Sequence, residues 1–102
     1  MPNNEKIIVK VDAELAELIP DYLKSRFVDA KTVVRLADAG DFEKARRLGH
    51  CMKGSGSGYG FDAVSEIGKS LEAAATARNK AEIAMQAEKL KKYLARVEVV
   101  YE

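Results

Sequence analysis

The chain has one histidine, His50, and an imidazole is the side chain best suited to accepting and donating groups near neutral pH. If residues 41–59 are helical, at about 100° per residue, their apolar side chains share one face. His50 then lies roughly 140–160° from that face and points to solvent. A neutral, exposed imidazole nitrogen could serve as the nucleophile in phosphoryl transfer. The apolar face comprises Ala45, Leu48, Met52 and Tyr59.

The same exposed face carries cations and residues with little or no side chain. Phosphoryl transfer asks little covalent chemistry of the protein, so positioning and charge neutralisation do most of the catalysis. Lys53 could offer its ammonium to phosphoryl oxygens, while Gly54 and Ser57 would leave the in-line approach open. Arg46, Arg47 and Ser57 are predicted to contact a partner, although both arginines also fit plain surface charge. On spacing alone, the histidine itself could be no more than a solvated helix residue.

Other chemistries find less support in the sequence. Cys51 adjoins the histidine but projects about 100° away from it, which argues against a Cys–His nucleophile pair. It is the only cysteine, so an internal disulfide and a four-thiolate zinc site are excluded, and no metal site is predicted. Segment 58–63 matches a loosened dinucleotide fingerprint and segment 68–70 the end of a P-loop. The first lacks a preceding strand and the second its initial glycine, so both are rejected.

Composition predicts a single domain over residues 1–102. The chain is 47% hydrophobic and 32% charged with a net charge of +1, which gives no support to nucleic-acid or membrane binding. No apolar run approaches the ~20 residues that span a bilayer, and the polar start, MPNNEK, is unlike a signal peptide. We expect a cytoplasmic protein. The Met1 start and the short tail after Val100 favour a free-standing one.

Periodicity predicts a helical protein with a short extended lead-in over 7–11. Asp12 can cap a brief helical turn, and Pro20 is well placed to begin a helix that Gly40 stops. The inward stripe of that helix is predicted to be Leu23, Phe27, Ala30, Val34 and Ala37.

Three more helices are predicted, begun by the capping residues Asp41, Asp62 and Asn79. The last is expected to carry an apolar stripe as far as Val97 and Tyr101. Short links between the helices predict an antiparallel bundle. The apolar stripe of the last helix comprises Ile83, Ala87, Leu90, Leu94, Val97 and Tyr101.

The glycine- and serine-rich stretch 54–60 is ambiguous. Each glycine costs a helix about 1 kcal/mol relative to alanine, so composition favours a loop. Tyr59, however, continues the apolar stripe from Met52 through the small Gly56, so phase favours a helix.

The stretch His-Cys-Met-Lys-Gly at 50–54, with Gly60 ten residues after the histidine, resembles the histidine-containing phosphotransfer (HPt) domain family. The similarity runs from about Leu18 to about Ala75. It includes Gly-Asp-Phe-Glu at 40–43, Arg-Leu-Gly at 47–49, Gly-Tyr-Gly-Phe at 58–61, Ile-Gly at 67–68 and Leu-Glu at 71–72.

The resemblance implies an all-α four-helix bundle with a short additional N-terminal helical segment and a largely helical glycine-rich stretch. Members of the family shuttle phosphoryl groups between aspartates of receiver domains, normally without an ATP site. The implied partners are therefore receiver domains and possibly a hybrid sensor kinase. No cofactor is expected in this chain, since Mg²⁺ would be bound by the receiver, and a monomer is expected.

The resemblance also assigns roles. His50 would be phosphorylated, Lys53 would stabilise the phosphoryl group and Gly54 would keep the histidine accessible. Glu72 falls where some members carry a glutamine that hydrogen-bonds the imidazole; a carboxylate there could accept from Nδ1–H and leave Nε2 nucleophilic. It could equally be a solvated helix residue.

Docking is expected to use an apolar patch near the histidine together with the basic residues Arg46 and Lys53. Two other functions stay open. One is an interaction module that binds a receiver or kinase without being phosphorylated, and the other is a catalytic domain that uses ATP directly.

Overall fold

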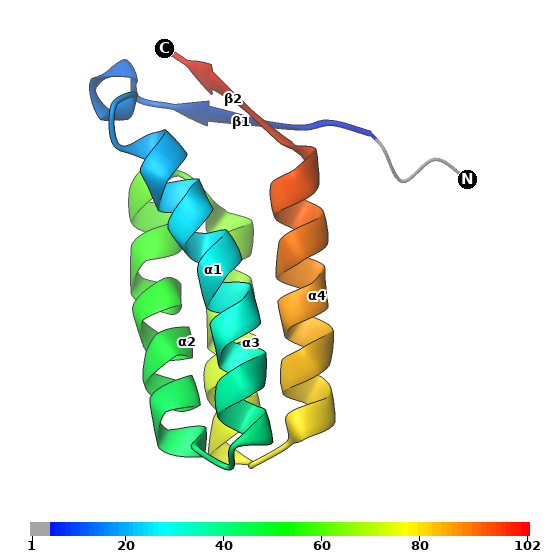
Figure 1. Ribbon diagram of the computed structural model, residues 1–102. Helices are drawn as coiled ribbons and strands as arrows, with labels where there is room; N and C mark the ends of the chain where they lie inside the picture. The colour runs from blue at the N-terminus through cyan, green and yellow to red at the C-terminus, as the bar shows by residue number, and fades with distance from the viewer. Residues whose placement is uncertain (1–4) are drawn as a thin grey trace.

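Four helices, joined by short turns, lie alternately up and down and form a four-helix bundle (Figure 1). This computed structural model describes residues 5–102, and it confirms the predicted all-α class. The first four residues of the polar start lie outside the described residues. The helices are α1 (Ile19–Asp38), α2 (Phe42–Gly56), α3 (Asp62–Thr76) and α4 (Lys80–Arg96).

Each helix buries one apolar face in a common core, and each fully buried large side chain contributes about 1.5–3 kcal/mol. In α1 the predicted face was partly wrong. Tyr22 and Val33 are buried, whereas Phe27 is 39% exposed with the Lys31 ammonium 5.1 Å from its ring centre. Helix α1 has so many apolar side chains that more than one of its faces could be buried, and packing against the other helices decides which one is. The largest fully buried side chains are Phe61, Ile19, Met52, Leu71, Ile83, Leu90, Val33 and Val64.

Two short strands lie side by side across one end of the bundle (Figure 1). The predicted extended lead-in is β1 (Ile7–Val11), and it pairs in parallel with β2 (Val97–Tyr101), with Val9 opposite Val99. The prediction that the last helix continues through Val97 and Tyr101 was therefore wrong. These residues fit a helical stripe, but the segment is rich in β-branched side chains, which favour a pleated surface.

The predicted short N-terminal addition is confirmed, and its helical part is a single turn. Between β1 and α1 the chain forms one 3₁₀ turn (Ala13–Leu15), in which Asp12 caps the backbone N–H of Glu14 at 2.8 Å. The extra segment is thus a strand and a single turn.

Of the three caps predicted for the helices of the bundle, two are confirmed. The Asp41 carboxylate accepts from the Lys44 backbone N–H (3.2 Å), and the Asn79 amide oxygen accepts from that of Glu82 (3.1 Å). Such a cap contributes about 1 kcal/mol. The third was wrong, because α3 begins one residue earlier, with Phe61 at the cap position and Asp62 inside the first turn.

Three helical segments end in the same hydrogen-bonded turn, with a 6→1 and a 5→2 backbone bond. The turn follows α1, then the 3₁₀ extension of α2 (Ser57–Tyr59), then α3. In each, one residue takes a left-handed conformation: Gly40 (φ 78°), Gly60 (φ 96°) and Arg78 (φ 56°). Glycine adopts this conformation without a steric penalty, whereas a residue with a Cβ does not.

Candidate functional site

Helices α2 and α3 touch through their backbones, because glycines occupy the contact positions. A Cβ on Gly49 would lie 2.7 Å from the Glu72 backbone nitrogen, and one on Gly68 would lie 2.8 Å from the Gly49 carbonyl oxygen. A Cβ on Gly56 would meet the Ser65 backbone nitrogen at 2.5 Å. None of these sites has room for a methyl group, so the glycines set the distance at which α3 side chains reach across α2.

The glycine-rich stretch is helical, as phase and the resemblance predicted, and Ser65 of α3 holds its end in place. The Ser65 hydroxyl donates to the Lys53 carbonyl (2.8 Å) and accepts from the Ser57 backbone N–H (2.7 Å). Sequence reasoning missed Ser65, since a lone serine in a helix carries no signal. Ser57, predicted to bind a partner, lies about two turns beyond the histidine, and its bonds go to Ser65.

His50 projects from α2 into solvent, with 61% of its side chain exposed. Its Nδ1 lies 2.9 Å from Oε2 of Glu72 on α3, the contact predicted from the resemblance. A carboxylate can only accept, so this bond favours the tautomer in which Nδ1 carries the proton. The lone pair then sits on Nε2.

Glu72 is shared between the histidine and Lys53, whose Nζ lies 2.9 Å from Oε1. The hydrogen bond from Lys53, and secondly that from His50, lower the pKa of Glu72 below its ordinary value of 4.5. Glu72 is therefore a carboxylate at neutral pH. One carboxylate from α3 thus positions both functional side chains of α2.

Arg46 extends this group along α2. Its guanidinium lies 2.7 Å from Glu43 and 4.0 Å from Glu72. Arg47 lies 3.3 Å from Glu43 and is mostly exposed. Hydrogen bonding from Arg46, with a smaller contribution from Arg47, lowers the pKa of Glu43 to about 2. Of the two arginines predicted to bind a partner, Arg46 adjoins the histidine site and Arg47 lies at its edge.

The surface beside the histidine is open and polar. A Cβ on Gly54 would meet nothing within 4 Å, so this position faces open space. Helices α2 and α3 themselves contribute no exposed large hydrophobic side chain beside the histidine, so these two helices do not form the expected apolar docking patch. Within residues 5–102, the exposed large hydrophobic side chains lie outside α2 and α3, at Ile8, Leu18, Phe27, Val28, Met85, Val100 and Tyr101.

The model of the Hpt domain family matches residues 10–99, which is most of the chain. The chain therefore belongs to the Hpt domain family. It is a histidine phosphotransfer module of phosphorelay signalling, a class whose partners are receiver domains. Searches of curated proteins and of solved structures gave no match. No helix within residues 5–102 is long and apolar enough to cross a membrane.

Proposed function

We propose that this protein is a phosphorelay intermediate that accepts a phosphoryl group on His50 from a receiver aspartate and passes it to another receiver. The observation that carries the proposal is the 2.9 Å contact between Nδ1 of an exposed histidine and Glu72. It orients the ring and directs the free lone pair to solvent, where a partner can reach it.

In the forward step, Nε2 of neutral His50 attacks the phosphorus of the aspartyl phosphate. The N–P bond forms as the P–O bond to the aspartate breaks, and that bond pair leaves on the aspartate carboxylate. The phosphorylated ring keeps its Nδ1 proton and becomes cationic. Glu72 faces that proton, so its negative charge stabilises the product ring.

Lys53 supplies the second charge. It is paired with Glu72 in the unphosphorylated protein and is 40% exposed, so its ammonium can turn towards phosphoryl oxygens on the neighbouring turn. Mg²⁺ bound by the receiver would neutralise charge on the group in transfer. This protein itself contributes three groups to the transfer: the His50 imidazole, the Glu72 carboxylate and the Lys53 ammonium. We also propose that the protein acts as a monomer in the cytoplasm.

Phosphotransfer profiling tests the proposal. The protein is incubated with a panel of aspartyl-phosphorylated receiver domains, and phosphohistidine is detected by mass spectrometry under conditions that preserve acid-labile phosphate. His50 should take up the label, and His50→Gln should fold normally but take up none. Label on the Gln variant would contradict the proposal. Binding without label on the wild type would favour the interaction module, and label from ATP alone would favour a kinase domain.

A further inference from the structure

Arg78 occupies a backbone position at which the other two equivalent turns of the molecule have glycine. All three turns have the same pair of backbone hydrogen bonds, and Arg78 is the non-glycine residue with positive φ in residues 5–102. A side chain in the left-handed region is strained, and such strain is concentrated at functional sites. The arginine therefore calls for an explanation beyond the turn itself.

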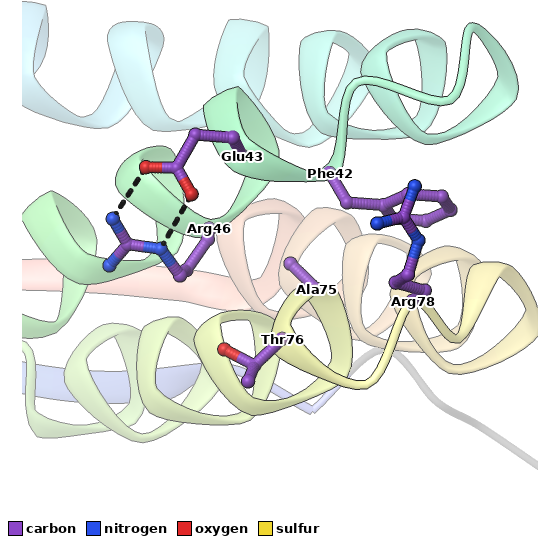
Figure 2. A pocket seen from close by; sticks show the side chains of 6 residues that line it. All are labelled: Phe42, Glu43, Arg46, Ala75, Thr76 and Arg78. Atoms are coloured by element: carbon purple, nitrogen blue, oxygen red, sulfur yellow. Dashed lines mark hydrogen bonds and ion pairs between the residues drawn. The ribbon is translucent and has the colours of Figure 1, made fainter.

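The Arg78 side chain reaches across to the start of α2. Its guanidinium carbon lies 5.1 Å from the centre of the Phe42 ring. Beside this contact is an open hollow of about 230 Å³ between the first turns of α2 and the last turn of α3 (Figure 2). It is lined by Phe42, Glu43, Arg46, Ala75, Thr76 and Arg78.

The hollow adjoins the histidine site. Arg46 lines the hollow and also lies 4.0 Å from Glu72, which binds the imidazole. On the next turn of α3, the Thr76 hydroxyl donates to the Glu72 carbonyl at 2.9 Å. A protein docked on the histidine would therefore also cover the hollow.

Charge identifies what the hollow would bind. The chain carries a net charge of only +1, but this face has four cations and two carboxylates. Both carboxylates are already paired with cations of the face, whereas Arg78 forms no ion pair with a carboxylate of residues 5–102. The cations are Arg46, Arg47, Lys53 and Arg78, and the carboxylates are Glu43 and Glu72.

We propose that Arg78, which lines the same hollow as Arg46, binds an acidic side chain on the surface of the receiver that docks at the histidine. Phe42 forms an apolar wall beside the Arg78 guanidinium, 5.1 Å from it, and the N–H groups can pair with a carboxylate. Arg78 is thus a specificity-determining residue of the docking surface. This inference rests on the proposed phosphotransfer function.

The test measures phosphorylation of the Arg78→Gly variant by two different phosphoryl donors. Glycine suits the left-handed backbone position, so this variant should keep the turn. One donor is the receiver domain that transfers fastest in the profiling panel, and the other is the small molecule phosphoramidate. With the receiver, the KM for transfer should rise about tenfold, and added NaCl should weaken transfer less than in the wild type. With phosphoramidate, the rate of phosphohistidine formation should not change.

Lys31→Ala is the matched control, because Lys31 also lies 5.1 Å from a phenylalanine ring, but on α1. It should leave the receiver KM unchanged, whereas Arg78→Lys should restore part of the Arg78→Gly loss. An unchanged receiver KM in Arg78→Gly would overturn the inference, as would equal losses with both donors. Failure of the wild type with every donor would instead overturn the proposed function.

Discussion

Helix α2 meets its two neighbours in opposite ways. Towards α3 it presents glycines, and the two backbones are in contact. Towards α1 the contact is made by side chains: the Tyr22 ring lies 4.5 Å from that of Tyr59, and its hydroxyl lies 2.9 Å from Ser55. The Arg26 guanidinium lies over the Tyr22 ring, 4.7 Å from its centre.

The difference corresponds to what each interface has to do. A backbone contact leaves no side-chain rotamer to adjust, so it fixes the separation of α2 and α3 and thereby the 2.9 Å bond between His50 and Glu72. The contact with α1 fills volume, and rings and a hydroxyl can shift slightly without moving the histidine. The α2–α3 interface should therefore be the one that tolerates least change.

Gly68→Ala should show the largest effect. Its Cβ would collide with the Gly49 carbonyl and the Lys53 backbone nitrogen, and backbone atoms cannot rotate away. Overpacking of this kind costs about 1–3 kcal/mol, so the free energy of unfolding should fall by about 2 kcal/mol in urea denaturation. Transfer from a receiver should slow as well, because the added methyl group pushes α3 away from α2 and moves Glu72 away from the histidine.

Gly58→Ala is the control for this prediction, since a Cβ there would meet nothing within 4 Å. It should leave stability unchanged or raise it by up to about 1 kcal/mol. If Gly68→Ala were as stable and as active as Gly58→Ala, the close contact would not be what positions the site.

Glu72→Gln should come next, with its effect mainly on transfer. The amide oxygen can still accept from Nδ1–H, but the negative charge facing the phosphorylated ring is lost. We expect transfer from a receiver to slow about tenfold, and about a hundredfold in Glu72→Ala, which has no acceptor. Rates equal to wild type in both variants would make Glu72 a plain surface residue.

The same variant tests the pH dependence of stability. The pKa of Glu72 is lowered on folding, so its contribution is fully present above the unfolded value of 4.5 and is lost as pH falls through the folded value. The difference in unfolding free energy between wild type and Glu72→Gln should therefore shrink as pH falls below about 4.5. A difference that stays constant down to pH 2 would contradict the assigned ion pairs.

Tyr22→Phe should have a smaller effect, restricted to stability. The substitution keeps the ring packing but removes the hydrogen bond to Ser55. Loss of this bond should lower the free energy of unfolding by about 0.5–1.5 kcal/mol. Transfer rates should match the wild type. Tyr101→Phe, at an exposed strand position, is the matched control and should be neutral. Slower transfer in Tyr22→Phe would show that the α1 side also positions the histidine.

The sequence predicted the parts of the molecule that depend on periodicity and local signals. Helical phase placed His50 on the exposed face of a helix, and three of the four predicted caps were correct because Asp12, Asp41 and Asn79 act on their own backbone neighbours. The end of α4 could not be predicted, since the residues of β2 fit a helix stripe until β1 is available to pair with them.

The site itself was only partly readable. The resemblance, rather than spacing, pointed to Glu72, which lies 22 residues from His50 along the chain. The packing role of Gly49 and Gly68 was hidden, because composition shows glycine as a helix breaker and not as a close contact. Arg78 was missed for a similar reason: nothing in sequence marks an arginine that takes a left-handed backbone conformation.

Gly54→Ala should have the smallest effect on the fold. It distinguishes the glycines of α2 that contact α3 from the one that faces solvent. Unlike Gly49 and Gly56, it faces open space, so alanine should raise the free energy of unfolding by about 0.5–1 kcal/mol through helix propensity. The added methyl lies one turn from His50, on the surface that a receiver must approach. Transfer from a receiver should therefore slow although the protein is more stable, while labelling by phosphoramidate stays unchanged. A variant that is both more stable and equally fast with receivers would show that Gly54 is not needed for access.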